Sequence, residues 1–144
     1  MITTVARRLG SLREKVVFVD GCATGLFITD PAMPEVRVTK DVDVIIDIAT
    51  RMEYSRLEAD LRSKGFRNDI SEDAPLCRWV VDGIKVDVMP TKKDILGFSN
   101  HWYLPAIENA NDVQLNNELA IKLVTSPYFL ATKIEVRGAA REIL

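Results

Sequence analysis

The pattern of apolar and polar positions along the chain predicts short strands that alternate with helices. Runs rich in β-branched residues predict strands at Lys15–Asp20, Asp41–Ile48, Phe66–Ile70, Leu76–Val81 and Ile84–Met89, and one or two strands within Val113–Val124. Helical signals cover Cys22–Ile28, Met52–Lys64 and Ser126–Arg137, the last with Ser126 as N-cap and Pro127 as first helical position. Prolines and polar residues predict irregular chain at Thr29–Lys40 and Asn100–Asn111.

The dipeptide Asp82-Gly83 separates two of these strands. Asp-Gly supplies the positive φ angles that a two-residue hairpin turn requires, so the flanking strands are expected to pair as antiparallel neighbours. The order of the elements then indicates an α+β fold, a mixed β-sheet with helices packed mainly on one face. No repeat or linker divides the sequence, so residues 1–144 are expected to form a single domain.

Composition narrows the class of protein. With 144 residues, 47% of them hydrophobic and 28% charged, the chain can bury a core without disulfides or a structural metal. Its formal net charge of -2 provides no global basic field that would attract nucleic acid or an anionic membrane. Cys22 and Cys77 form neither a CxxC motif nor a Cys/His cluster, and no apolar run approaches the length of a membrane span. These features favour a cytoplasmic protein with no membrane partner.

Asp41 and Asp43 begin the most strongly β-branched run of the chain. Side chains two apart on a strand point to the same face, so the two carboxylates are expected together while Val42 and Val44 point into the core. This pattern fits a divalent-cation site, and the solvated end of a strand is the alternative interpretation.

Asp87 interrupts an otherwise apolar strand. In the strand Ile84–Met89, it shares a face with Lys85 and Met89. Because an unpaired carboxylate is costly in such a strand, Asp87 is expected to contact either a cation, for which Lys85 is the candidate, or a metal ion.

Asp41, Asp43 and Asp87 together would repel one another and raise one another's pKa values unless a hard cation neutralised them. Magnesium prefers oxygen ligands and is usually shared between protein carboxylates and substrate phosphates. The sequence therefore predicts a magnesium site made of these three residues.

Four segments, in this order, resemble the DNA polymerase β nucleotidyltransferase superfamily, and within it the abortive-infection nucleotidyltransferase toxins. The segments are Asp20-Gly21-Cys22, the RxTxDxD string of residues 37–43, Ile84–Val88 around Asp87, and Pro127–Glu135 around Lys133. The resemblance extends from about Val16 to Arg137, and the RxTxDxD string is its most specific part.

The resemblance implies a polymerase β palm-like fold and the transfer of a nucleoside monophosphate from an NTP to a hydroxyl group. Asp41 and Asp43 would bind metal, and Asp87 would complete the cluster and help to activate the acceptor hydroxyl. Two magnesium ions are expected when the NTP is bound.

The resemblance also implies four nucleotide-binding residues. Gly21 and Cys22 would hold a phosphate through their backbone N–H groups, Thr39 belongs to the same set, and Lys133 would reach the triphosphate. An alternative for Lys133 is that it only extends its ammonium group from an apolar helix into water.

The chain departs from the family pattern in three places. Cys22 replaces the usual Gly or Ser, so a hydroxyl contact is lost, and the long gap between Gly21 and Asp41 implies a loop inserted at Pro31–Glu35. Relatives continue past the lysine-bearing helix, so the C-terminal helical part and full acceptor recognition are expected to be missing.

The sequence leaves the acceptor open between a tRNA, a protein and a small molecule, and it does not fix the preferred base. If the chain is a toxin-antitoxin component, a cognate antitoxin protein is a further expected partner. One alternative is a degenerate, non-catalytic domain that binds nucleotides or a toxin-antitoxin partner. Another is a glycosyltransferase that uses a DxD motif, although that function explains neither Asp87 nor Lys133.

Overall fold

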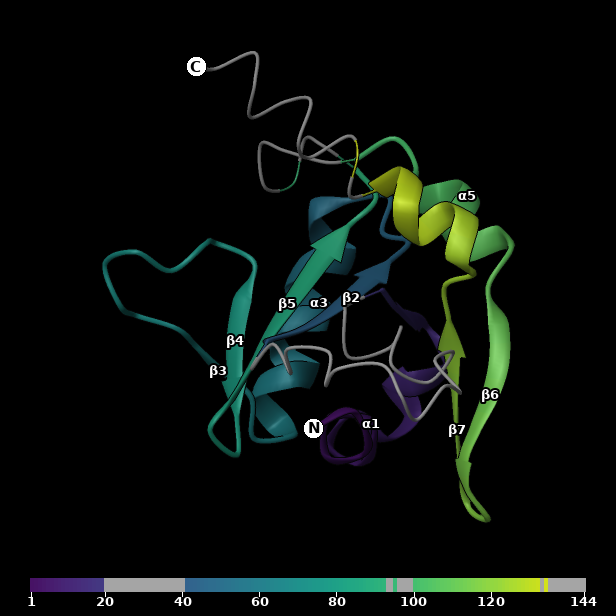
Figure 1. The fold of residues 1–144 in the computed structure, drawn as a ribbon. Helices are drawn as coiled ribbons and strands as arrows, with labels where there is room; N and C mark the ends of the chain where they lie inside the picture. Colours follow the sequence, from purple (N-terminus) through teal and green to yellow (C-terminus); the bar gives the residue numbers. More distant parts are fainter. Residues whose placement is uncertain (20–40, 93–94, 96–99, 133, 135–144) are drawn as a thin grey trace.

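The described residues form one seven-stranded mixed sheet, in the strand order β3-β4-β5-β2-β1-β7-β6 (Figure 1). This computed structural model describes residues 1–19, 41–92, 95, 100–132 and 134. The strands are β1 (Val16–Phe18), β2 (Asp41–Ile46), β3 (Arg67–Asn68), β4 (Arg78–Val81), β5 (Ile84–Pro90), β6 (Asn111–Asn116) and β7 (Leu119–Leu123).

Strand directions alternate within the sheet except at two places. β5 runs parallel to β2, and β7 runs parallel to β1, whereas β1 and β2 are antiparallel, as are β3 with β4, β4 with β5, and β6 with β7. The described residues thus have an α+β fold with a mixed sheet, as the sequence predicts.

The described helical elements are α1 (Ile2–Leu9), the 3-10 helix η1 (Gly10–Glu14), α3 (Arg51–Ser63) and α5 (Tyr103–Glu108), and residues 126–132 are also helical. The side chain of Thr50 caps α3 by accepting the N–H of Glu53 at 3.1 Å. Glu53 in turn accepts the N–H of Ala49 at 3.2 Å, which fixes the start of the helix after β2.

Both faces of the sheet carry apolar clusters. On one face, α1 and α3 bury residues such as Leu9 and Leu61 against Val42, Val44 and the same face of the other strands. On the opposite face, Ile45 packs in a smaller cluster with Tyr103 and Ala106 of α5, and Tyr128 and Phe129 contact it. The expectation that helices cover mainly one face therefore holds for α1 and α3 but not for α5 (Figure 1).

The hairpin predicted at Asp82-Gly83 is confirmed. Both residues have positive φ, 50° and 75°, and Val81 pairs with Ile84 across the two-residue turn. Arg8 of α1 donates to both carboxylate oxygens of Asp82, at 2.7 and 3.0 Å, and so ties the turn to the first helix.

Two expectations about secondary structure need correction or completion. Asn100–Asn111 is not mainly irregular, because α5 forms there and β6 begins at Asn111. Val113–Val124 contributes to two strands, β6 and β7, which pair with each other. The expected helix at Cys22–Ile28, the expected loop at Thr29–Lys40 and the end of the expected C-terminal helix lie outside the described residues.

No helix in the part of the chain that the structure describes is long and apolar enough to cross a lipid bilayer.

Candidate functional site

Asp43 of β2 and Asp87 of β5 are register partners on neighbouring parallel strands. Asp41 pairs in the same way with Lys85, one alternation back along the two strands. Val42 and Val44 point into the α1/α3 core. Asp41 and Asp43 alternate with them along β2 and therefore point to the opposite face. The strands that carry Asp41, Asp43 and Asp87 are therefore neighbours, with the three carboxylates on one face.

The end of β1 lies beside this acidic group. The N–H of Val19 donates to the carbonyl oxygen of Asp43 at 2.9 Å, so the chain leaves β1 next to the DxD strand. The expected nucleotide-binding residues Gly21, Cys22, Thr39 and Lys133 lie outside the described residues.

Arg78 of β4 contacts two of the three carboxylates. Its Nε donates to Oδ1 of Asp87 at 2.9 Å and its Nη2 donates to Oδ2 at 3.2 Å, which is a bidentate pair. The same Nη2 lies 3.6 Å from Oδ2 of Asp41. The hydrogen bonds that Arg78 donates to Asp87 raise the pKa of Arg78 above its ordinary value.

Burial distinguishes these two contacts. The side chains of Arg78 and Asp87 are 17% and 14% exposed, whereas that of Asp41 is 42% exposed. The pair between Arg78 and Asp87 is therefore largely screened from water, and the contact with Asp41 is at the edge of the solvent.

Among the described residues, the cationic partner of Asp87 is Arg78 and not Lys85, the candidate cation that the sequence indicated. The hairpin itself contained the signal, because a two-residue turn at Asp82-Gly83 places Arg78 directly opposite Asp87. Lys85 instead has an exposed side chain on the outer part of the same face.

Magnesium fits this group of residues by ligand type, since carboxylate oxygens are the ligands that it prefers. Within the described part of the chain, however, no three His, Cys, Asp or Glu side chains form a group that could hold a metal ion. Asp41, Asp43 and Asp87 share a face, and the guanidinium of Arg78 contacts Asp87 and Asp41.

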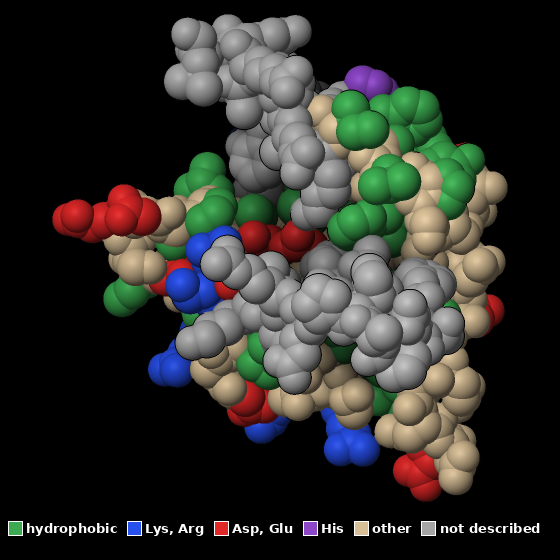
Figure 2. Space-filling view, in the orientation of Figure 1, with side chains coloured by type: hydrophobic (Ala, Val, Ile, Leu, Met, Phe, Trp, Pro, Cys, Tyr) green, Lys and Arg blue, Asp and Glu red, His purple; other side chains and the backbone are tan. Residues whose placement is uncertain are grey.

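Basic side chains adjoin the acidic group on the same sheet face. Register places Arg67 of β3, Val80 of β4, Lys85 and Asp41 in one row across four strands. Figure 2 shows basic and acidic atoms side by side at the middle of this face. The face thus presents cations on its β3 to β5 side and carboxylates on its β5 to β2 side.

Asp69, at the end of β3, has its pKa lowered chiefly by hydrogen bonds from the side chain and backbone N–H of Ser71. The charges of Lys85 and Arg78 lower it further. Asp69 therefore stays ionised beside the cationic side of the face.

Cys77 is a buried thiol immediately before β4. Its carbonyl oxygen accepts the N–H of Val88 at 2.9 Å, which fixes it against β5. Burial, with the nearby charges of Asp87 and Asp43, raises the pKa of this thiol to about 12. Cys77 is consequently an unreactive neighbour of the site and not a nucleophile.

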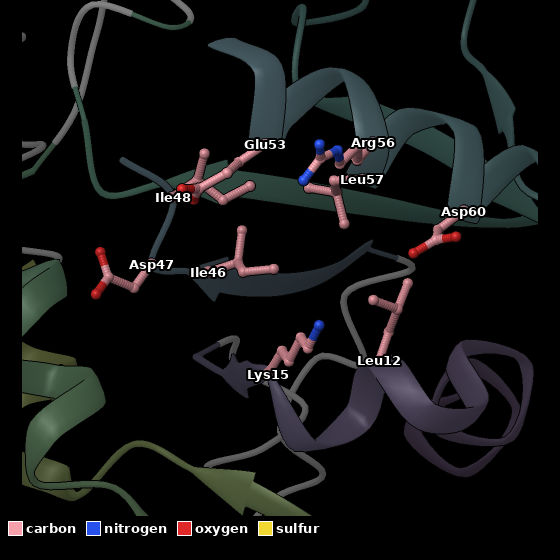
Figure 3. Close-up of a pocket in the computed structure, with 9 residues that line it drawn as sticks. All are labelled: Leu12, Lys15, Ile46, Asp47, Ile48, Glu53, Arg56, Leu57 and Asp60. Atoms are coloured by element: carbon pink, nitrogen blue, oxygen red, sulfur yellow. The ribbon is translucent and has the colours of Figure 1, made fainter. Parts of the chain in front are cut away.

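A separate hollow of about 550 Å³ lies on the α3 side of the sheet (Figure 3). Lys15 and Arg56 supply its cations, and aliphatic side chains such as Ile46 and Leu57 line its floor. Among its carboxylates, Glu53 is engaged in capping α3. Because Asp41 and Asp43 point to the other face of β2, this hollow is not part of the acidic group.

Comparisons of sequence do not assign the chain: no protein-family model matches it, and neither does any curated protein.

Proposed function

We propose that the protein is a magnesium-dependent nucleotidyltransferase with a polymerase β palm-like fold, which transfers a nucleoside monophosphate from an NTP to a hydroxyl group. The observation that carries the proposal is the pairing of Asp43 with Asp87 on parallel neighbouring strands, with Asp41 on the same face. Carboxylate oxygens are the ligand type that magnesium prefers, and two carboxylates from one strand with a third from the next support a shared site.

The described residues have distinct parts in this proposal. Asp41 and Asp43 would hold the metal, and Asp87 would complete the group and accept the proton of the attacking hydroxyl. Bound magnesium would neutralise the charge of the phosphates during transfer. The hydroxyl oxygen attacks the α-phosphorus, the bond to the bridging oxygen breaks, and pyrophosphate leaves.

The end of β1 supports the same proposal. The N–H of Val19 donates to the carbonyl oxygen of Asp43, so the described chain after β1 lies beside the acidic group, and Asp20-Gly21-Cys22 follows Val19 in the sequence. In the proposal, backbone N–H groups of Gly21 and Cys22 bind a phosphate of the donor, and Thr39 and Lys133 contribute to nucleotide binding.

A second candidate function is a non-catalytic domain that binds a nucleotide or a toxin-antitoxin partner. The specific observation in its favour is the bidentate ion pair of Arg78 with Asp87, since a structural ion pair also explains an acid on this strand. The two candidates differ in whether a covalent product forms.

Incubation with each of the four α-labelled NTPs, magnesium and a cell lysate tests the proposal. We expect label to enter one class of acceptor, namely a tRNA, a protein or a small molecule, and we expect EDTA and the Asp43→Asn variant to abolish it. Binding of Mg-NTP without any transfer of label would favour the non-catalytic domain. If the protein bound no Mg-NTP at all, both candidates based on a nucleotide would be wrong.

A further inference from the structure

Arg78 is the most heavily engaged cation of the candidate site, and its partners are two of the proposed metal ligands. We propose that Arg78 is a latch, which holds Asp87 and Asp41 in the metal-free protein and must release Asp87 before a divalent cation binds. This inference rests on the proposed function and assigns a positioning role to a residue outside the acidic group.

The geometry of the pair makes the competition direct. Nε and Nη2 of Arg78 donate to the two different oxygens of Asp87, at 2.9 and 3.2 Å, so neither oxygen is free of the guanidinium. A metal ion needs one of these oxygens as a ligand, and a guanidinium and a divalent cation beside the same carboxylate repel each other. Release of Arg78 therefore accompanies binding of the metal.

Burial strengthens the ion pair with which a metal ion would compete. The side chains of Arg78 and Asp87 are 17% and 14% exposed, so water replaces their mutual contacts less readily than it would at an open surface. The additional contact of Arg78 with Asp41 means that one cation offsets charge on two acids. Arg78 thus offsets the charge that a bound magnesium ion would offset.

A released Arg78 needs a new anionic partner. A guanidinium that leaves a carboxylate in a poorly exposed position is stabilised by phosphate oxygens, which it binds in the same forked geometry. The triphosphate of the donor supplies such oxygens. The latch therefore predicts that divalent cation and triphosphate bind with positive cooperativity, since each favours the released position of Arg78.

The test measures binding of Mn²⁺ by electron paramagnetic resonance, without nucleotide, to the wild type and to the variants Arg78→Gln, Arg78→Lys and Arg67→Gln. Arg67 is a matched control, because it is an exposed cation on the same face that forms no ion pair with a described residue. We expect Arg78→Gln to bind Mn²⁺ more tightly than the wild type by about fivefold or more, the lower range of coupling between sites. Arg67→Gln should change the affinity by less than about twofold, since an exposed and screened charge acts weakly.

Arg78→Lys retains a cation but not the fork, so it should bind Mn²⁺ with an intermediate affinity. It also keeps the test possible if Arg78→Gln fails to fold. Added tripolyphosphate should increase the affinity for Mn²⁺ more in the wild type than in either Arg78 variant. The Mn²⁺ that tripolyphosphate binds by itself is subtracted. Removal of a nearby positive charge by itself also favours binding of a divalent cation. The loss of cooperativity with tripolyphosphate in the Arg78 variants is therefore the result that a merely structural ion pair would not give.

If the Arg78 variants bind Mn²⁺ no more tightly than Arg67→Gln, while the wild type still transfers label from an NTP, the latch is wrong and the proposed function stands. If the wild type and all variants bind no Mn²⁺ with or without NTP, the proposed function fails and the latch fails with it.

Discussion

Asp43 and Asp87 are register partners on the neighbouring parallel strands β2 and β5, although they lie 44 positions apart in the sequence. Like charges placed opposite each other on neighbouring strands destabilise a sheet unless a cation offsets them. Arg78 is one such cation, because its guanidinium contacts the carboxylates of Asp87 and Asp41. These charges therefore have a structural role in addition to the proposed chemical one.

Replacement of Asp43 by Asn should leave the metal-free protein within about 1 kcal/mol of the wild type, because one of several mutually repelling charges is removed. In the wild type, a hundredfold excess of Mg-NTP over its dissociation constant should add about 2.7 kcal/mol of stability. This corresponds to an increase of several degrees in Tm. The variant should lose that increase.

Thermal melts with EDTA, magnesium, NTP and Mg-NTP measure both quantities for Asp43→Asn. A variant that is less stable by about 1 to 3 kcal/mol without metal, as for loss of a buried hydrogen bond, yet keeps its Mg-NTP shift would contradict the proposed metal site.

Replacement of Asp87 by Asn should reduce the free energy of unfolding by about 2 to 3 kcal/mol, since the poorly exposed guanidinium of Arg78 loses its charged partner. Asp41→Asn is the matched control, because this carboxylate is 42% exposed and 3.6 Å from the same guanidinium. It should cost less than about 1 kcal/mol. Urea unfolding of the two variants gives the comparison, and equal losses would show that burial does not distinguish the contacts.

Cys77 should resist thiol reagents in the folded protein at pH 8. Burial, with the charges of Asp87 and Asp43, raises its pKa to about 12, so almost no thiolate is present. Labelling with a chromogenic disulfide in a Cys22→Ser variant isolates this thiol. We expect reaction only after urea is added, and rapid labelling of the native variant would show that Cys77 is accessible.

The stability of the protein should fall as pH rises from about 9 to about 12. Burial raises the pKa of Cys77 from 9.0 to about 12 and that of Tyr54 from 10.0 to about 12, the latter with a contribution from Glu58. Because both groups lose their protons more easily in the unfolded chain, the stabilisation is complete below pH 9 and is lost as the pH approaches the folded pKa values.

Urea midpoints measured across this range test the alkaline loss. The variants Cys77→Ala and Tyr54→Phe should each flatten part of the profile. An identical slope in the wild type and both variants would assign the loss to other groups.

Replacement of Gly83 by Ala should lower the free energy of unfolding by about 1 to 2 kcal/mol. At φ 75° a Cβ is strained by its own backbone, while nothing within 4 Å would contact it. Glu118→Ala, an exposed change in the turn between β6 and β7, should have little effect. Chemical denaturation of both variants measures the difference, and a neutral Gly83→Ala would mean that the turn changes its conformation at no cost.

Much of the secondary structure is predictable from the sequence, and the misses have physical reasons. Tyr103–Glu108 was expected to be irregular because a six-residue helix is too short to show a clear period, and it forms by packing Tyr103 and Ala106 against Ile45. The sequence interpretation gave no element at Ile2–Leu9, although its buried residues recur at helical spacing.

The alternation of residues along each strand determined which side chains share a face, because side-chain direction follows from the local backbone. That is why Asp41, Asp43 and Asp87 could be selected before any fold was known, and why the turn at Asp82-Gly83 was predictable. Only the tertiary structure decided that β5 lies beside β2, that the two run parallel, and that Asp43 meets Asp87. Strand order and pairing depend on burial of both sheet faces by distant helices, which no local pattern contains. The pairing of Asp87 with Arg78 and not with Lys85 depends on both. The hairpin register, which the sequence determines, places Arg78 opposite Asp87, and the tertiary structure buries the pair.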